Sequence, residues 1–174
     1  MRLLTTPRLR LEPLVGAHAE EMFRVLSDPA IYEFENQPPA SLAWLCERYA
    51  RLETRCSADG RQQWLNWVLR LHAGEPIGYV QATVLTDRRA LVAYELSSLF
   101  WGRGLAHEAV DREIAELVGH YRVQRLLAVL KAANHRSRRL LDRLGFRVAT
   151  AEEIADEDVA ADELLMVRAL RGLC

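Results

Sequence analysis

The residues best suited to chemistry lie between Ala93 and Ala109, where a carboxylate precedes a glycine-rich turn. The segment reads AYELSSLFWGRGLAHEA, with Glu95 on an apolar run and with Gly102 and Gly104 ahead of apolar residues at helical spacing. This order predicts a strand, a turn and then a helix. The first turn of a helix presents unpaired N–H groups and the positive end of its dipole, and glycines leave room for an anion to reach them. The turn is therefore a candidate phosphate or pyrophosphate site.

The spacing of the glycines distinguishes this turn from two common phosphate-binding motifs. A P-loop requires the pattern GxxxxGK followed by Ser or Thr, which the sequence lacks. A dinucleotide-binding turn requires Gly or Ala three residues after Gly104, where His107 stands. The string WGRGLA at 101–106 instead resembles the pyrophosphate loop of the GNAT superfamily of acetyl-CoA-dependent N-acetyltransferases, except that Trp101 replaces the Gln or Arg at its first position. With the HEA that follows, the string resembles the branch that contains the ribosomal-protein Nα-acetyltransferases.

A second segment supports the same resemblance. The superfamily pattern NxxSxxLYxKxGF is matched at Asn134, Ser137, Leu140, Arg143, Gly145 and Phe146. The departure is Leu141, which stands where many members have Tyr.

The resemblance implies acetyl-CoA as co-substrate. Backbone amides of the glycine turn would hold its pyrophosphate, and Asn134 and Ser137 would contact its pantetheine arm and phosphates. The candidate CoA-binding residues are Leu96, Ser97, Gly102, Arg103, Gly104, Leu105, Ala106, His107, Asn134 and Ser137. The basic face formed by Arg136, Arg138, Arg139 and Arg143 is either solvated or supplies a contact to the 3′-phosphate.

Transfer from a thioester to an amine requires a neutral nucleophile, and a lysine-like amine titrates near pH 10.4. A positioned base then accelerates the reaction by about 10² to 10⁴. Glu95 is the candidate base, because the resemblance places its strand beside the thioester. Glu33, Glu35 and Tyr32 are the alternatives.

The resemblance also implies a bulge in the strand around Glu95 to Ser97. Such a bulge would free backbone groups for pantetheine, and an N–H near Leu96 would polarise the thioester carbonyl. Because Leu141 removes the usual proton donor, Ser137 and Tyr94 are the remaining candidates for the general acid. The leaving thiolate has a parent thiol of pKa near 8.5, so it departs largely unaided near neutral pH.

The bulk properties predict one domain over residues 1–174. Half of the residues are apolar, 27% are charged and the net charge is −1, so nothing indicates a general affinity for nucleic acid or for an anionic membrane. No apolar run reaches the roughly 18 residues of a membrane span, and the N-terminus lacks a signal-peptide core, which favours the cytoplasm. Cys46, Cys56 and Cys174 share no metal-binding spacing, so we expect reduced thiols and no metal site.

Hydrophobic periodicity predicts an α/β (α+β) protein, and the order of its strands and helices resembles that of the GNAT fold. This resemblance implies a mixed, mostly antiparallel central sheet of about seven strands, flanked by about four helices and splayed in the middle for CoA. Ser41 and Asn134 are the predicted helix caps, and Gly145 is a predicted helix end. The predicted strands cover 7–14, 63–72, 77–86, the run before the glycine turn, 125–131, 146–150 and 164–170, and the predicted helices cover 17–26, 41–52, 103–119 and 134–144.

The acceptor is the part that the sequence defines least. The segment 151–163 carries seven carboxylates, and the resemblance places it over the acceptor side of the cleft, which predicts a cationic amine. A solvated acidic loop is the alternative interpretation. A protein N-terminus, a polyamine, an aminoglycoside and an amino-acid derivative all suit the scaffold, and the oligomeric state is open between monomer and homodimer. A CoA-binding or acyl-CoA-binding protein without turnover is the alternative to the enzyme.

Overall fold

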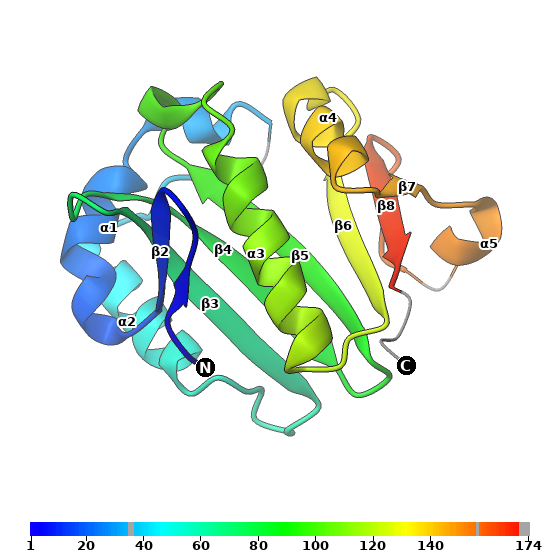
Figure 1. Ribbon diagram of the computed structural model, residues 1–174, viewed down its shortest axis with the longest axis horizontal. Helices are drawn as coiled ribbons and strands as arrows, with labels where there is room; N and C mark the ends of the chain where they lie inside the picture. The colour runs from blue at the N-terminus through cyan, green and yellow to red at the C-terminus, as the bar shows by residue number, and fades with distance from the viewer. Residues whose placement is uncertain (35–36, 156, 171–174) are drawn as a thin grey trace.

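The computed structural model describes residues 1–34, 37–155 and 157–170 (Figure 1). Glu35 and Cys174, for which the sequence makes predictions, lie outside the described residues. The described strands are β1 (Leu4–Thr5), β2 (Leu9–Pro13), β3 (Gln62–Leu71), β4 (Pro76–Leu85), β5 (Arg89–Leu96), β6 (Arg125–Lys131), β7 (Arg147–Val148) and β8 (Glu163–Ala169). The described α-helices are α1 (Ala19–Val25), α2 (Leu42–Glu53), α3 (Leu105–Gly119), α4 (His135–Arg143) and α5 (Ala151–Ile154), with short 3₁₀ turns at Gly16–His18, Pro29–Tyr32 and Ser98–Phe100.

The eight strands form one sheet in the order β1-β2-β3-β4-β5-β6-β8-β7. All neighbouring pairs are antiparallel except β5 and β6, which run parallel. The predicted mixed, mostly antiparallel sheet is therefore confirmed. The two elements beyond the prediction are the short edge strand β1 and the one-turn helix α5.

Helices cover both faces of this sheet. Figure 1 shows α3 lying across the central strands, with α4 beside the end of β6 and α5 beyond β7 and β8. The apolar side chains of α3 and the buried Leu141 of α4 share a core with Leu11, Trp67 and Leu126. Side chains of α1 and α2 form a second core on the opposite face with Val68. Because side chains alternate along a strand, residues on one face of β5 lie under α3 and their neighbours lie under α1 and α2.

Local signals set the ends of the elements that carry the site. The side chain of Ser41 accepts a hydrogen bond from the Trp44 N–H, and that of Asn134 accepts one from the Ser137 N–H, which confirms both predicted caps. Gly145 follows α4 with φ of 79°, a left-handed conformation that glycine adopts without strain. Among the helices in the described part of the chain, none is long and apolar enough to cross a membrane.

Candidate active site

The sheet opens between its two parallel strands. β5 pairs with β6 only from Arg89 to Leu91, opposite Arg125 to Leu127. Beyond these residues the two strands line a cleft of about 840 Å³, to which Tyr94, Glu95 and Leu96 contribute. The cleft connects the two faces of the sheet, since Tyr94 and Glu95 are neighbours on one strand and point to opposite faces. The predicted splay in the middle of the sheet is confirmed.

The predicted bulge in β5 is not found in its pairing with β4. The register runs without a shift from Val84 opposite Ala90 to Gly78 opposite Leu96. Gly78 explains the close pairing, because a Cβ on this residue would stand 2.1 Å from the carbonyl oxygen of Glu95. The cleft therefore arises from the early end of the β5–β6 pairing alone. The irregularity in this part of the sheet is a register shift between β3 and β4.

The glycine turn forms one wall of the cleft. Gly102 and Gly104 both have φ of 74°, and Gly104 is the N-cap of α3. The first intrahelical bond runs from the Glu108 N–H to the Gly104 carbonyl, so the three N–H groups before it are those that α3 leaves free for an anion. The cleft is lined here by Gly102, Gly104, Leu105, Ala106 and His107.

Two predicted CoA-binding residues do not line the cleft. Arg103 points its guanidinium over the ring of Phe100 at 5.4 Å, and its carbonyl accepts a hydrogen bond from Arg8. Ser97 uses its N–H in a hydrogen bond to the Ile77 carbonyl. Its hydroxyl lies 3.5 Å from a carboxylate oxygen of Asp28. Both residues shape the turn from outside the cleft.

The start of α4 faces β5 across the cleft. A hydrogen bond of 2.7 Å joins the Tyr94 hydroxyl to the Ser137 Oγ, so the two candidate proton donors form one pair. Leu141, one turn further along, is 1% exposed and offers only apolar atoms. Of the arginines on this helix, the cleft is lined by Arg136, Arg139 and Arg143.

Glu95 is the one carboxylate among the described residues that line the cleft. It lies directly opposite Tyr79 of β4, so the two side chains share one face of the sheet. Burial raises the pKa of Tyr79 far above its usual value, and the charge of Glu95 raises it further. Burial and then Glu95 also raise the pKa of Tyr32. Burial raises the pKa of Tyr49, with a smaller contribution from Glu95, so all three hydroxyls stay protonated.

The alternative bases are less well placed. Glu33 does not line the cleft and forms an ion pair with Arg136 at 3.5 Å. Arg136 in turn lies over the Trp101 ring at 3.7 Å. The Tyr32 hydroxyl donates to the carbonyl of Leu26 at 2.8 Å. Glu95 is therefore the acid whose carboxylate faces the opening of the sheet.

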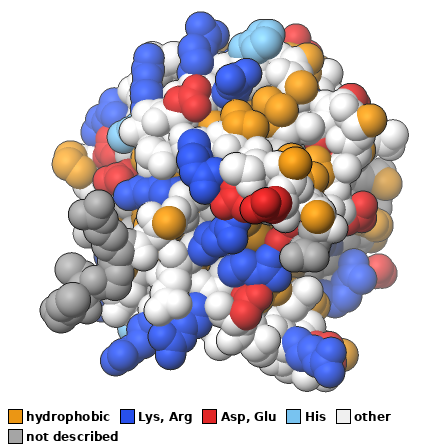
Figure 2. Space-filling model, turned by 90° about the vertical axis from the view of Figure 1, so that its right-hand side faces the viewer, with side chains coloured by type: hydrophobic (Ala, Val, Ile, Leu, Met, Phe, Trp, Pro, Cys, Tyr) orange, Lys and Arg blue, Asp and Glu red, His pale blue; other side chains and the backbone are white. Residues whose placement is uncertain are grey.

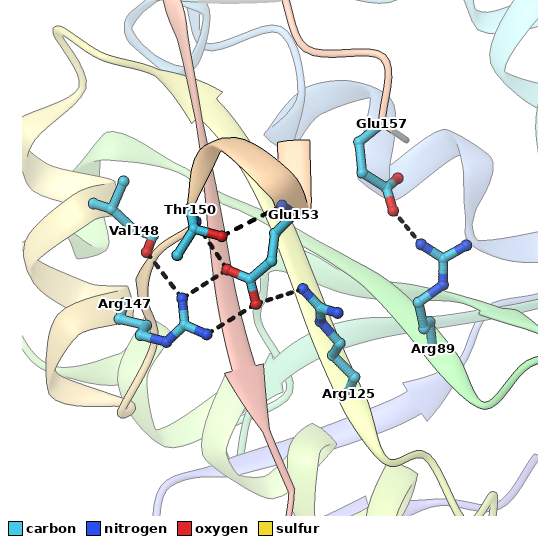
Figure 3. Close-up of polar contacts among 7 residues, drawn as sticks. All are labelled: Arg89, Arg125, Arg147, Val148, Thr150, Glu153 and Glu157. Atoms are coloured by element: carbon cyan, nitrogen blue, oxygen red, sulfur yellow. Dashed lines mark hydrogen bonds and ion pairs between the residues drawn. The ribbon is translucent and has the colours of Figure 1, made fainter. Parts of the chain in front are cut away.

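The acidic segment 151–163 packs on the face of the sheet that carries Glu95, where Ile154 and Val159 contact Leu127. None of its described residues lines the cleft. Thr150 caps α5 in a reciprocal pair with Glu153. Figure 3 shows Glu153 between Arg147 and Arg125, and Glu157 beside Arg89.

Basic side chains pair with four of the carboxylates in the described part of the segment. Lys131 pairs with Asp162 and Glu163 at 3.0 and 2.9 Å. Hydrogen bonds from Arg147 and from the Thr150 N–H lower the pKa of Glu153 to about 2. Figure 2 shows basic and acidic side chains interspersed on this face of the molecule. The segment therefore binds to β5 and β6 through ion pairs outside the cleft.

Sequence reasoning missed Tyr79, although a signal for it existed. A hairpin that turns around Asp87 places residue 79 opposite residue 95, because each is eight residues from the turn. Tyr49 and Arg48 of α2 also line the cleft. Their position depends on how α2 docks on the sheet, and no local pattern specifies that.

Comparisons with known proteins agree with this geometry. Residues 8–147 match the family model described as Acetyltransferase (GNAT) domain. A curated relative, Uncharacterized N-acetyltransferase YoaA of Bacillus subtilis (strain 168), is 26% identical over 151 residues, which cover 83% of this chain and 82% of that protein.

Two solved structures extend the comparison. An acetyltransferase from Thermus thermophilus has a TM-score of 0.70 at 26% identity and covers 98% of this chain and 100% of its own. RimL, described as a ribosomal L7/L12 alpha-N-protein acetyltransferase in complex with coenzyme A, has a TM-score of 0.81 at 13% identity, with 97% of this chain and 98% of RimL covered. At that identity RimL bears on the fold alone, and it confirms the predicted arrangement of sheet and helices.

Proposed function

Because the chain belongs to the GNAT acetyltransferase domain family, we propose that it transfers an acetyl group directly from acetyl-CoA to a primary amine. One observation carries this proposal. A cleft through the sheet has a helix N-terminus on one side and the carboxylate of Glu95 on the other. Such a cleft offers an anion site and a proton acceptor within one continuous space, which a transfer from a phosphate-bearing thioester to an amine requires.

CoA would enter on the face that carries α3 and α4. Its pyrophosphate would accept hydrogen bonds from the N–H groups of Leu105, Ala106 and His107. The nearby guanidinium groups of Arg139 and Arg143 would offset the remaining phosphate charge. The pantetheine arm would lie between β5 and β6, where the two strands no longer pair with each other.

The acceptor would enter from the α1 and α2 face and meet Glu95. Glu95 would take a proton from the ammonium, and the neutral amine nitrogen would bond to the thioester carbonyl carbon. The nitrogen would then release a second proton to solvent as the C–S bond breaks, which leaves the amide and the CoA thiolate. Tyr79 lies opposite Glu95 on β4, and its hydroxyl, kept protonated by burial, would position the carboxylate. The Tyr94 and Ser137 pair would give a proton to the leaving thiolate, a role that the buried Leu141 cannot perform.

The second candidate function is a CoA-binding or acyl-CoA-binding protein without turnover. Leu141 favours it, because the helix offers no hydroxyl at that position. A protein N-terminus, the acceptor that the description of RimL names, and a small-molecule amine are both compatible with direct transfer.

An assay of CoA release separates the two functions. Purified protein is incubated with acetyl-CoA and single amines or peptides, and the free thiol is measured. We expect release that depends on the acceptor, and we expect Glu95→Gln to lower kcat by about 10² with little change in acetyl-CoA affinity. Glu75→Gln, in the exposed turn between β3 and β4, is the matched control and should retain full activity. Binding of acetyl-CoA without turnover of any acceptor would instead support the binding protein.

A further inference from the structure

The part of the cleft beneath α1 and α2 is lined by polar side chains, and some of them, Asn66 and Tyr49 among them, have no hydrogen-bond partner within the described residues. We call it the acceptor pocket and define it by Arg48, Tyr49, Asn66, Tyr79, Gln81 and Glu95. Asn66 and Gln81 lie directly opposite each other on β3 and β4, so their side chains share one face of the sheet. That row lies two residues along the strands from Tyr79 and Glu95, a distance of about 7 Å.

Buried groups in this pocket have hydrogen-bonding capacity to spare. Asn66 is 5% exposed, and its side-chain amide makes no hydrogen bond to any described residue. The hydroxyl of Tyr49, a residue that is 3% exposed, is buried without a partner in the described part of the chain. Leaving a buried donor unsatisfied costs about 1–3 kcal/mol, so native structures almost always give such groups a partner. A polar ligand group in the pocket would give the Asn66 amide such a partner.

The positive charge of Arg48 favours a ligand that carries a negative charge. Its guanidinium lies over the Trp44 ring at 5.6 Å, and within the described residues it forms no ion pair. Its charge acts to lower the pKa of both Tyr49 and Tyr79, against the larger effect of burial, which places it within electrostatic reach of the two tyrosines around Glu95. The pocket therefore contains one anion, Glu95, and one cation, Arg48.

The pocket continues beyond Arg48. A second hollow of about 140 Å³ adjoins it and shares Arg48, Asn66 and Gln81 as lining residues. A group that reaches these three residues has passed Glu95 and lies at the inner end of the acceptor. Asn66 is almost fully buried, so a group that reaches it lies against the floor of the pocket.

We propose that the acceptor is a small amine that carries a carboxylate, of the amino-acid class. This inference rests on the proposed function and specifies its substrate. The amine lies at Glu95, and the carboxylate accepts hydrogen bonds from Arg48 and from the amide groups of Asn66 and Gln81. A polyamine fits poorly, because its second ammonium group would face Arg48 without a counter-charge.

The test compares amino acids with their own carboxamides, which keep the amine and remove the negative charge. On the unmodified protein we expect kcat/KM to favour the amino acid by about 100-fold. Arg48→Gln should lower kcat/KM for the amino acid by about 30-fold or more, mainly through KM, and should leave the carboxamide within about threefold. Arg51→Gln, an exposed arginine on the same helix, is the control and should change neither value.

The outcomes separate the acceptor class from the reaction. Equal or better turnover of carboxamides or polyamines, unchanged by Arg48→Gln, would overturn the carboxylate proposal and leave the acetyltransferase in place. Preferential turnover of peptides with acidic N-terminal residues would overturn the small-molecule assignment. Turnover of no amine at all would overturn the proposed function itself. The comparison of amino acids with carboxamides uses the unmodified protein, so it does not depend on whether a variant folds.

Discussion

A carboxylate placed on the glycine turn tests whether that turn binds phosphate. At Gly102 the backbone has φ of 74°, and an added Cβ meets no atom within 4 Å, so Gly102→Asp introduces charge without a clash. The left-handed backbone costs an Asp about 1 kcal/mol, and this cost falls on stability. Two charges about 5 Å apart interact by about 3 kcal/mol at an effective dielectric constant of 20, which corresponds to an affinity for acetyl-CoA weaker by roughly 100-fold.

Two matched variants isolate the charge at the turn from the strain. Gly60→Asp has φ of 69° and equally open space far from the cleft, so it should show the same loss of stability and unchanged binding. Gly102→Asn keeps the shape and removes the charge, and it should bind acetyl-CoA within about tenfold of the parent. Calorimetry at low and high salt measures the affinities, and the deficit of Gly102→Asp should shrink as salt rises. An affinity of Gly102→Asp within threefold of the parent would refute the assignment of the turn.

Three further perturbations test the neighbouring elements. Tyr94→Phe removes one member of the hydroxyl pair with Ser137. We expect kcat to fall by about tenfold at low pH and to recover as pH approaches the thiol pKa near 8.5. A ratio of variant to parent kcat that does not change with pH would exclude the pair as the proton donor. Gly78→Ala places a Cβ 2.1 Å from the Glu95 carbonyl oxygen. It should lower the free energy of unfolding by about 1–3 kcal/mol more than Gly74→Ala, where the left-handed backbone has open space. Equal melting temperatures of the two variants would show that β4 and β5 separate freely. The pKa of Glu153 is about 2 in the folded chain, below its unfolded value near 4.3, so its stabilising contribution is present above pH 4.3 and is lost as pH falls toward 2. Glu153→Gln should therefore have a lower melting temperature than the parent at pH 7 and an equal one near pH 2. A difference in melting temperature that does not depend on pH would contradict the ion pairs.

Local sequence patterns predicted the parts of the fold that local physics determines. The caps Ser41 and Asn134 act within one helical turn, and the glycine turn needs only two left-handed residues before α3. The helix α5 also had a local signal, because Thr150 and Glu153 form the reciprocal cap that precedes many helices. The excess of carboxylates in the segment led to its assignment as a loop.

The positions of the acidic segment and of Arg48 depend on contacts between residues that are far apart in the sequence. Glu157 pairs with Arg89 of β5 across 68 residues, and Ile154 and Val159 pack on Leu127, so long-range contacts place the acidic segment over β6 and β8. Arg48 reaches the cleft because α2 docks its buried Leu45 and Tyr49 against Val68. A sequence pattern shows that α2 is amphipathic, but the direction in which it crosses the sheet follows from packing alone.

A structure of the protein with bound CoA tests the central claim most directly. The account predicts the pyrophosphate oxygens about 3 Å from the N–H groups of Leu105, Ala106 and His107, the distance of a hydrogen bond. It also predicts the CoA sulfur between β5 and β6, beside Leu96 and on the side of the cleft that leads to Glu95. A CoA molecule that binds elsewhere, or whose thiol end points away from the opening between β5 and β6, would contradict it.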